Sequence, residues 1–127
     1  MKRLLATVIS VFSVNSIALE NIQLKDYKFL QEMNNDSYFP NHLVDKGKNI
    51  LIELCQQIEK EKPKGNDVYR LTHAATERFN DLNKEFGDNG SEIETVARDS
   101  IGGNVEFILQ TYGYDVDIEE AIAPRDW

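Results

Sequence analysis

The residues with the clearest chemical potential share one face of a predicted helix. His73, Glu77, Asn80 and Lys84 recur at steps of three and four, the spacing that places side chains on one face of an α-helix. His73 and Glu77 lie four residues apart, so they could bind one metal ion or act as an acid–base pair. The alternative is an exposed pair that adds roughly 0.3 kcal/mol to helix stability.

A metal site on this face lacks ligands in the sequence. Structural zinc takes about four ligands, and the chain holds two histidines, His73 and His42. If the helices that carry them pack antiparallel, His42 and the nearby Asp45 lie far from His73. His73, Glu77 and His42 are therefore weak metal candidates, and we expect no metal and no cofactor.

Other catalytic patterns are incomplete. Cys55, the single cysteine, lies in an apolar helical stripe, which predicts a small buried side chain, because a reactive thiol needs an exposed, electropositive setting. The residues from Asp81 to Glu92 imitate a calcium-binding loop, but Phe86 occupies the position that requires glycine. The sequence has no Ser-His-Asp order and no phosphate-binding glycine loop. Binding is therefore favoured over catalysis.

The elements that position these residues are predicted to be helices. Apolar residues recur at steps of three and four over residues 41–61, 68–86 and 91–112, and each stretch predicts an amphipathic helix. Shorter patterns over residues 25–33 and 117–123 predict a short first and a short last helix. No stretch alternates with period two for long enough to form a sheet. The predicted fold class is all-α, a small helical bundle of three principal helices plus the two short ones.

Local signals refine the predicted helix ends. Asp67 is placed to cap the helix over residues 68–86. Ser91 and Glu94 have the spacing of a capping box at the start of the next helix. The helical register of that next helix continues through its glycine pair, which favours one helix over two.

Two further patterns predict tertiary contacts. Gly47 lies on the apolar stripe of the helix over residues 41–61, which indicates close approach by another helix or by the aromatic residues before it. The polar residues around Asn80 either face solvent or form a network that holds Arg78 or the C-terminal residues. We favour the network for Trp127, because an indole left in water would forgo a large buried area.

Residues 1–18 have the pattern of a secretory signal peptide. A basic start precedes eleven mostly apolar residues, and Ser16 and Ala18 supply the small residues of a cleavage site. Cleavage is expected before Leu19. The apolar run is shorter than the roughly 20 residues of a membrane span. We predict that residues 19–127 form a single helical domain that is periplasmic or secreted. An N-terminal anchor or a wrongly assigned start codon is the alternative, and the latter would leave the protein cytoplasmic.

The chain is acidic, with 22 Asp and Glu against 14 Lys and Arg and a formal net charge of -8. Residues 1–18 hold two of the bases and no acid, so residues 19–127 carry 12 bases and 22 acids, or -10. This balance argues against nucleic acid, because phosphate binding requires clustered Lys and Arg. It also disfavours an anionic membrane surface. An acidic domain suits a basic protein partner, although solubility alone is the commoner reason for such a charge.

Longer motifs resemble a known family. They lie in residues 25–33, 38–48, 71–82, 90–95 and 125–127, and include Lys25-Asp26-Tyr27, Tyr38-Phe39-Pro40, Leu71-Thr72-His73-Ala74-Ala75, Gly90-Ser91-Glu92 and Arg125-Asp126-Trp127. Together they are similar to a family of small bacterial proteins known as domain of unknown function 5713. The resemblance covers nearly everything after residue 20. It implies no activity, no cofactor and no catalytic residues.

These observations favour a small exported acidic helical protein that binds a partner protein. Its most concrete form is an immunity or inhibitor protein against a secreted toxin. The residues expected to meet a basic partner are Asp115, Asp117, Glu119 and Glu120. Two alternatives stay open. One is a metal-dependent or acid–base enzyme that uses His73 and Glu77, with His42 as a further candidate. The other is a cytoplasmic regulatory module, if residues 1–18 are not an export signal.

Overall fold

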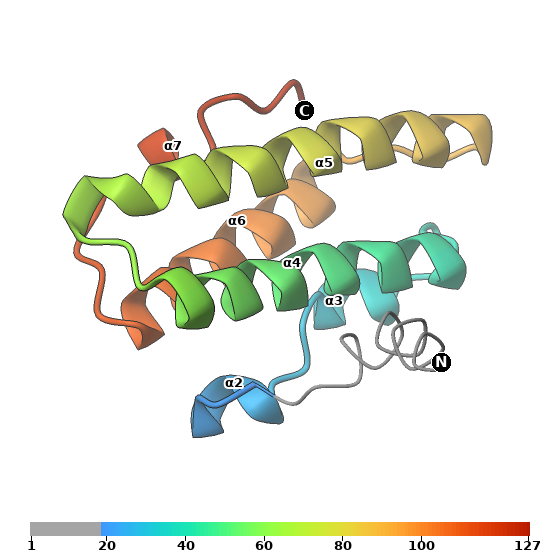
Figure 1. Ribbon diagram of the computed structural model, residues 1–127. Helices are drawn as coiled ribbons and strands as arrows, with labels where there is room; N and C mark the ends of the chain where they lie inside the picture. Colours follow the sequence, from blue (N-terminus) through green and yellow to red (C-terminus); the bar gives the residue numbers. More distant parts are fainter. Residues whose placement is uncertain (1–18) are drawn as a thin grey trace, which may run out of the picture.

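The computed structural model describes residues 19–127, so the predicted signal peptide over residues 1–18 lies outside the described residues. Within the described part, helices are joined by turns and loops, and no strand occurs. The principal helices are α4 (Asn41–Glu61), α5 (Tyr69–Asp88) and α6 (Thr95–Thr111). Figure 1 shows α4 and α5 side by side and antiparallel, with α6 crossing behind them. The prediction of an all-α bundle with three principal helices is confirmed.

Short helical segments complete the bundle. They are α2 (Ile22–Lys25), α3 (Gln31–Asn34), the 3-10 helix η1 (Gly65–Val68) and α7 (Ile118–Ala121). The segment α3 packs against α4 and α6, and α7 packs against α5 and α6. No helix in residues 19–127 has both the length and the apolar character needed to cross a membrane.

The prediction of one helix over residues 25–33 is wrong, because α2 ends at Lys25, residues 26–30 are not helical, and α3 begins at Gln31. Leu30, between them, has a φ of 52°, in the left-handed region that costs a residue with a side chain roughly 1–2 kcal/mol. Its amide donates a hydrogen bond to Asn104 Oδ1 at 2.8 Å, and its side chain is fully buried. A contact with α6, 74 residues further along the chain, therefore overrides the local helical pattern.

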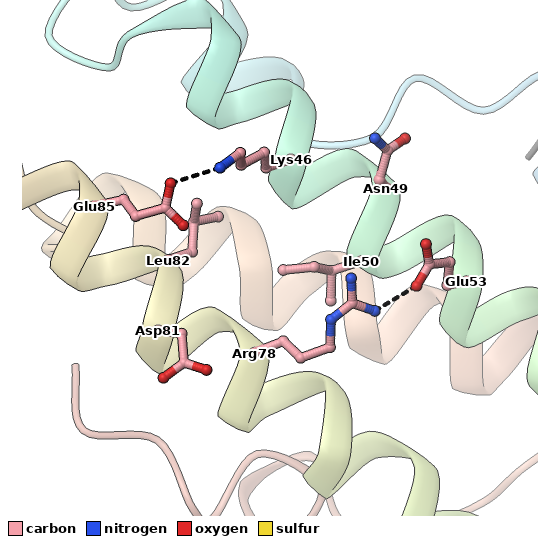
Figure 2. Close-up of a pocket in the computed structure, with 8 residues that line it drawn as sticks. All are labelled: Lys46, Asn49, Ile50, Glu53, Arg78, Asp81, Leu82 and Glu85. Carbon is pink, nitrogen blue, oxygen red and sulfur yellow. Dashed lines mark hydrogen bonds and ion pairs between the residues drawn. The ribbon is translucent and has the colours of Figure 1, made fainter. Parts of the chain in front are cut away.

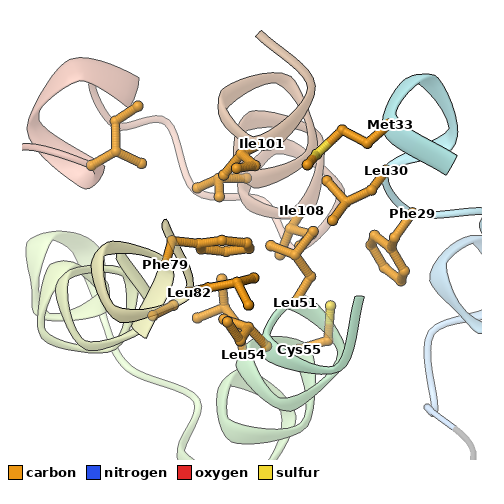
Figure 3. Close-up of a cluster of buried hydrophobic side chains, with 14 of the residues drawn as sticks. Phe29, Leu30, Met33, Leu51, Leu54, Cys55, Phe79, Leu82, Ile101 and Ile108 are labelled. Atoms are coloured by element: carbon orange, nitrogen blue, oxygen red, sulfur yellow. The ribbon is translucent and has the colours of Figure 1, made fainter. Parts of the chain in front are cut away.

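The apolar stripes of the three principal helices meet in a shared core. Figure 3 shows side chains of α4, α5, α6 and the α3 region pointing toward one another. The buried residues labelled there are Phe29, Leu30, Met33, Leu51, Leu54, Cys55, Phe79, Leu82, Ile101 and Ile108. Burial raises the pKa of the Cys55 thiol to about 12, so the thiol stays protonated at neutral pH. Cys55 is the small buried side chain that its helical stripe predicts.

Among the glycines of residues 19–127, Gly47 has the closest neighbours. A Cβ added there would lie 2.8 Å from Leu30 Cδ1 and 3.3 Å from Phe79 Cε1. The close neighbour is therefore α5 together with Leu30, and the predicted approach by another helix is confirmed.

Neither predicted helix cap is formed. Asp67 lies inside η1, and α5 begins without a side-chain cap. The N-cap residue of α6 is Glu94 and not Ser91, which lies outside the helix. Glu94 makes no side-chain capping hydrogen bond. The amide of Ile93 instead donates to Asn83 Oδ1 at 2.7 Å. This bond ties the connecting chain to α5 and delays the start of α6, which then continues unbroken through its glycine pair as predicted.

Candidate functional site

The polar face of α5 predicted from the sequence lies against the C-terminal segment, defined here as residues 117–127. His73 Nε2 lies 2.7 Å from the carbonyl oxygen of Glu120, and this contact requires the nitrogen to carry a proton and donate it. Tyr69 lies one turn earlier, and its hydroxyl accepts the amide of Asp117 at 3.0 Å. The rings of Tyr69 and His73 stack with centroids 5.9 Å apart. These two side chains hold α7 on α5.

Asn80 holds the rest of the C-terminal segment. Its Nδ2 donates to the carbonyl oxygen of Pro124 at 3.1 Å, and its Oδ1 accepts the amide of Asp126 at 3.0 Å. Trp127 packs edge-on against Phe79, with ring centroids 6.3 Å apart. The predicted tie between this face and the C-terminal residues is therefore formed by Asn80, through Pro124 and Asp126. Trp127 itself is held by ring packing, and its buried Nε1 has no hydrogen-bond partner among residues 19–127.

The structure does not bring the weak metal candidates together. His42 is exposed near the start of α4, whereas His73 lies near the start of α5. Because α4 and α5 run antiparallel, the two helix starts lie at opposite ends of the pair (Figure 1). Glu77 is exposed beside His73, whose Nε2 is already engaged by a backbone carbonyl. Among residues 19–127 no group of three or more His, Cys, Asp or Glu side chains could hold a metal ion. The main role of His73 in this structure is to fix α7.

The four predicted partner-binding residues lie on or beside α7, and all are exposed. They are Asp115, Asp117, Glu119 and Glu120, and we call them the acidic surface. Asp117 Oδ1 accepts the amide of Glu119 at 2.9 Å and so caps α7. Glu119 also lies 3.4 Å from the Arg125 guanidinium. The carboxylates are therefore held in a defined turn while remaining accessible.

A groove of about 350 Å³ between α4 and α5 was not predicted from the sequence. Figure 2 shows charged side chains reaching across it from one helix to the other. Lys46 Nζ lies 2.6 Å from Glu85 Oε1, and Arg78 Nη1 lies 2.5 Å from Glu53 Oε1. Each cation is thus matched by a carboxylate of the opposite helix. Such exposed ion pairs stabilise a folded protein by about 1 kcal/mol at most. Their main effect here is to link α4 and α5 across the groove.

Glu59, near the C-terminal end of α4, holds the start of the described chain. Its carboxylate accepts the amides of Glu20 at 2.9 Å and Asn21 at 3.0 Å, and it also accepts the Tyr112 hydroxyl. Burial opposes ionisation, but these donors outweigh it and lower the pKa of Glu59. Burial and the neighbouring Glu59 raise the pKa of Tyr112. Helical periodicity could not reveal this site, because the two amides lie 39 and 38 residues away along the chain.

Within residues 19–127, the side chains that could take part in catalysis therefore mostly make structural contacts. His73 fixes α7, Cys55 is buried and protonated, and Glu59 is bound by three donors. The acidic surface differs because its carboxylates remain exposed. This arrangement is suited to recognising a positively charged molecule.

Comparison with known proteins extends the resemblance seen in the sequence motifs. The model of a family of unknown function (DUF5713) matches residues 23–127, nearly the whole described chain. Comparisons with curated proteins and with solved structures gave no match. The family match brings no activity, ligand or partner, so function has to be argued from the geometry above.

Proposed function

This chain belongs to the DUF5713 family, and we propose that it is a small exported protein that binds a basic partner protein through its acidic surface. In the most concrete form of the proposal, it is an immunity or inhibitor protein that occupies a secreted toxin. The export part rests on the signal-peptide pattern of residues 1–18.

The observation that carries the proposal is the anchoring of the acidic surface to α5. Tyr69, His73 and Asn80 all bond to backbone atoms of the C-terminal segment, so they fix its path without using its carboxylates. A surface that is already ordered loses less conformational entropy when a partner binds. The anchoring therefore supports a role in recognition.

The charge of the chain supports the same proposal. Residues 19–127 carry a formal net charge of -10, which speeds encounter with a basic protein and disfavours acidic competitors. This contribution depends on ionic strength, because the screening length falls from about 10 Å at 0.1 M salt to about 3 Å at 1 M. Partner binding should therefore weaken as salt is added.

The test compares two variants that remove the same number of charges. In one, the acidic surface is neutralised by Asp115→Asn, Asp117→Asn, Glu119→Gln and Glu120→Gln. Asparagine at 117 can still cap α7. The matched control neutralises exposed carboxylates that lie outside this surface, by Asp45→Asn, Asp88→Asn, Glu92→Gln and Glu106→Gln.

The immobilised protein should retain a basic partner from periplasmic or secreted material at low salt and release it at high salt. The control variant should retain the same partner, and the acidic-surface variant should not. Equal retention by both variants, or no retained protein, would contradict the proposed surface. Fractionation with intact-mass measurement tests export separately. A mature form that starts at Leu19 supports it, and a full-length cytoplasmic protein would favour a cytoplasmic regulatory module instead.

A further inference from the structure

A second hollow, of about 430 Å³, lies between α6 and the chain that contains α2 and α3. The described residues that line it include the carboxylates of Glu32 and Asp99 and no basic side chain. Tyr27 and Val96 add aromatic and apolar surface, and these side chains are 36% and 46% exposed. The hollow thus combines negative charge with accessible apolar surface.

Two buried polar residues, Asn104 and Ser100, form the inner part of this hollow. Asn104 is 7% exposed, and its Oδ1 accepts the Leu30 amide at 2.8 Å. This bond fixes the orientation of the side-chain amide. Asn104 lines the hollow, and its Nδ2 donates no hydrogen bond to any atom of residues 19–127. Ser100 is 5% exposed and donates its hydroxyl to Glu32 Oε1 at 2.9 Å.

The aromatic side of the hollow is rigidly supported. The Tyr27 ring stacks on Phe107 with centroids 4.6 Å apart and an angle of 26° between the ring planes. Phe29 meets the same Tyr27 ring edge-on at 5.0 Å. An aromatic ring that lines the same hollow as carboxylates is a favourable setting for a cation, which both groups attract.

From this geometry we propose that the hollow binds a peptide segment containing lysine or arginine. The cationic group meets Glu32 and Asp99 beside the Tyr27 ring, and its aliphatic stem lies on Val96. Asn104 Nδ2 donates to a backbone carbonyl of the same segment. An acidic ligand is repelled by the two carboxylates. A neutral ligand would desolvate these carboxylates without pairing them, which is unfavourable.

The inference rests on the proposed function in one respect, that the peptide would belong to a basic partner protein. The hollow shares no residue with the acidic surface, so each can be tested alone. Gly102 of α6 lies near Ile122, just after α7, whereas the adjacent Gly103 lines the hollow.

The experiment uses a synthetic capped peptide, acetyl-Ala-Lys-Ala-amide, and a counterpart in which norleucine replaces the lysine. Both are titrated into isotope-labelled protein while amide signals are followed by nuclear magnetic resonance. The lysine peptide should give saturable shifts of the Asn104 side-chain amide and of the Tyr27 backbone amide. The norleucine peptide should bind roughly tenfold more weakly, because its charge-assisted contacts are lost.

A matched pair of variants shows whether the hollow itself is responsible. Gly103→Met fills the hollow, and a Cβ at Gly103 has nothing within 4 Å, so the fold has room for the new side chain. Methionine also favours a helix interior more than glycine does. Gly87→Met is the control on α5, where a Cβ likewise meets nothing within 4 Å. Gly103→Met should abolish the shifts of Asn104, and Gly87→Met should leave them unchanged.

Four results would overturn the inference. The first two are no shift with the lysine peptide and equal binding of the norleucine peptide. The others are shifts that persist in Gly103→Met and shifts that spread evenly to residues 115–120, which would indicate unspecific charge attraction. The assay needs no natural partner. Its failure is therefore distinct from failure of the proposed function, which is measured with the acidic-surface variant.

Discussion

The space around Gly47 allows the effect of a single methyl group to be predicted. A Cβ there would lie 2.8 Å from Leu30 Cδ1 and 3.3 Å from Phe79 Cε1, and both neighbours are buried. Gly47→Ala gains about 1 kcal/mol of helix propensity but loses about 1–3 kcal/mol to overpacking. We expect a net fall of about 1 kcal/mol in the free energy of unfolding, measured by urea denaturation.

Gly103→Ala is the matched control for this prediction. Gly103 is an exposed helical position where a Cβ meets nothing within 4 Å, so alanine should raise the free energy of unfolding by about 0.5–1 kcal/mol. If Gly47→Ala stabilised the protein as much as Gly103→Ala does, the close packing of Leu30 and Phe79 on α4 would be contradicted.

Also at the scale of single residues, the lowered pKa of Glu59 leads us to expect that its contribution to stability depends on pH. Its lowered pKa means that the ionised form is favoured in the folded protein. Its stabilisation is therefore complete above the unfolded value of about 4.3 and is lost as the pH falls through the lowered folded value. Glu59→Gln should lower the free energy of unfolding by about 1 kcal/mol at pH 7. This difference should shrink in acid.

The control for Glu59 is Glu77→Gln, which removes an exposed carboxylate on α5. We expect it to change stability by less than about 0.5 kcal/mol at any pH. Urea denaturation of both variants at several pH values gives the comparison. A Glu59→Gln deficit that stayed constant down to pH values well below the unfolded pKa would exclude ionisation of Glu59 as its source.

At the scale of elements, the long helices could be predicted and the short ones only in part. Apolar steps of three and four extend over many residues of α4, α5 and α6, so each pattern outweighs local exceptions such as the Gly102-Gly103 pair. The region before α4 depends instead on one distant hydrogen bond from Leu30 to Asn104. Ser91 and Glu94 fail as a capping box because Asn83 holds the chain before α6. Such long-range partners leave no periodic signal.

The attachment of the C-terminal segment to α5 can be tested by removing the side chain of Asn80. Asn80→Ala removes both hydrogen bonds that Asn80 makes to that segment, and each is worth about 1 kcal/mol. Amide hydrogen exchange should accelerate in residues 117–127 and change little in α4. Asn83→Ala removes one bond to Ile93 and should accelerate exchange before α6 instead. If both variants affected the same residues, separate anchoring roles would be contradicted.

For the molecule as a whole, the sequence predicts which polar and charged side chains share a surface better than it predicts the distant groups to which they bond. The polar face of α5 and the acidic residues near the C-terminus were found from spacing and charge. The packing of Trp127 was predicted from the burial that an indole requires, and Asn80 supplies the neighbouring hydrogen bonds, to Pro124 and Asp126. The structural role of Glu59 and the hollow beside Asn104 were not predicted, because backbone amides and distant loops complete them. These features arise from packing between segments far apart in the chain.

The core and the C-terminal segment are expected to unfold as one unit. Trp127 is the single tryptophan and packs on Phe79, a core residue of α5, so its fluorescence reports whether the segment is attached. Small domains with one core usually unfold in a single cooperative transition. Urea transitions followed by fluorescence and by far-ultraviolet circular dichroism should therefore coincide, whereas in Asn80→Ala the fluorescence transition should come first. If it already came first in the unaltered protein, the acidic surface would not be held in place, and the main support for the proposed function would be lost.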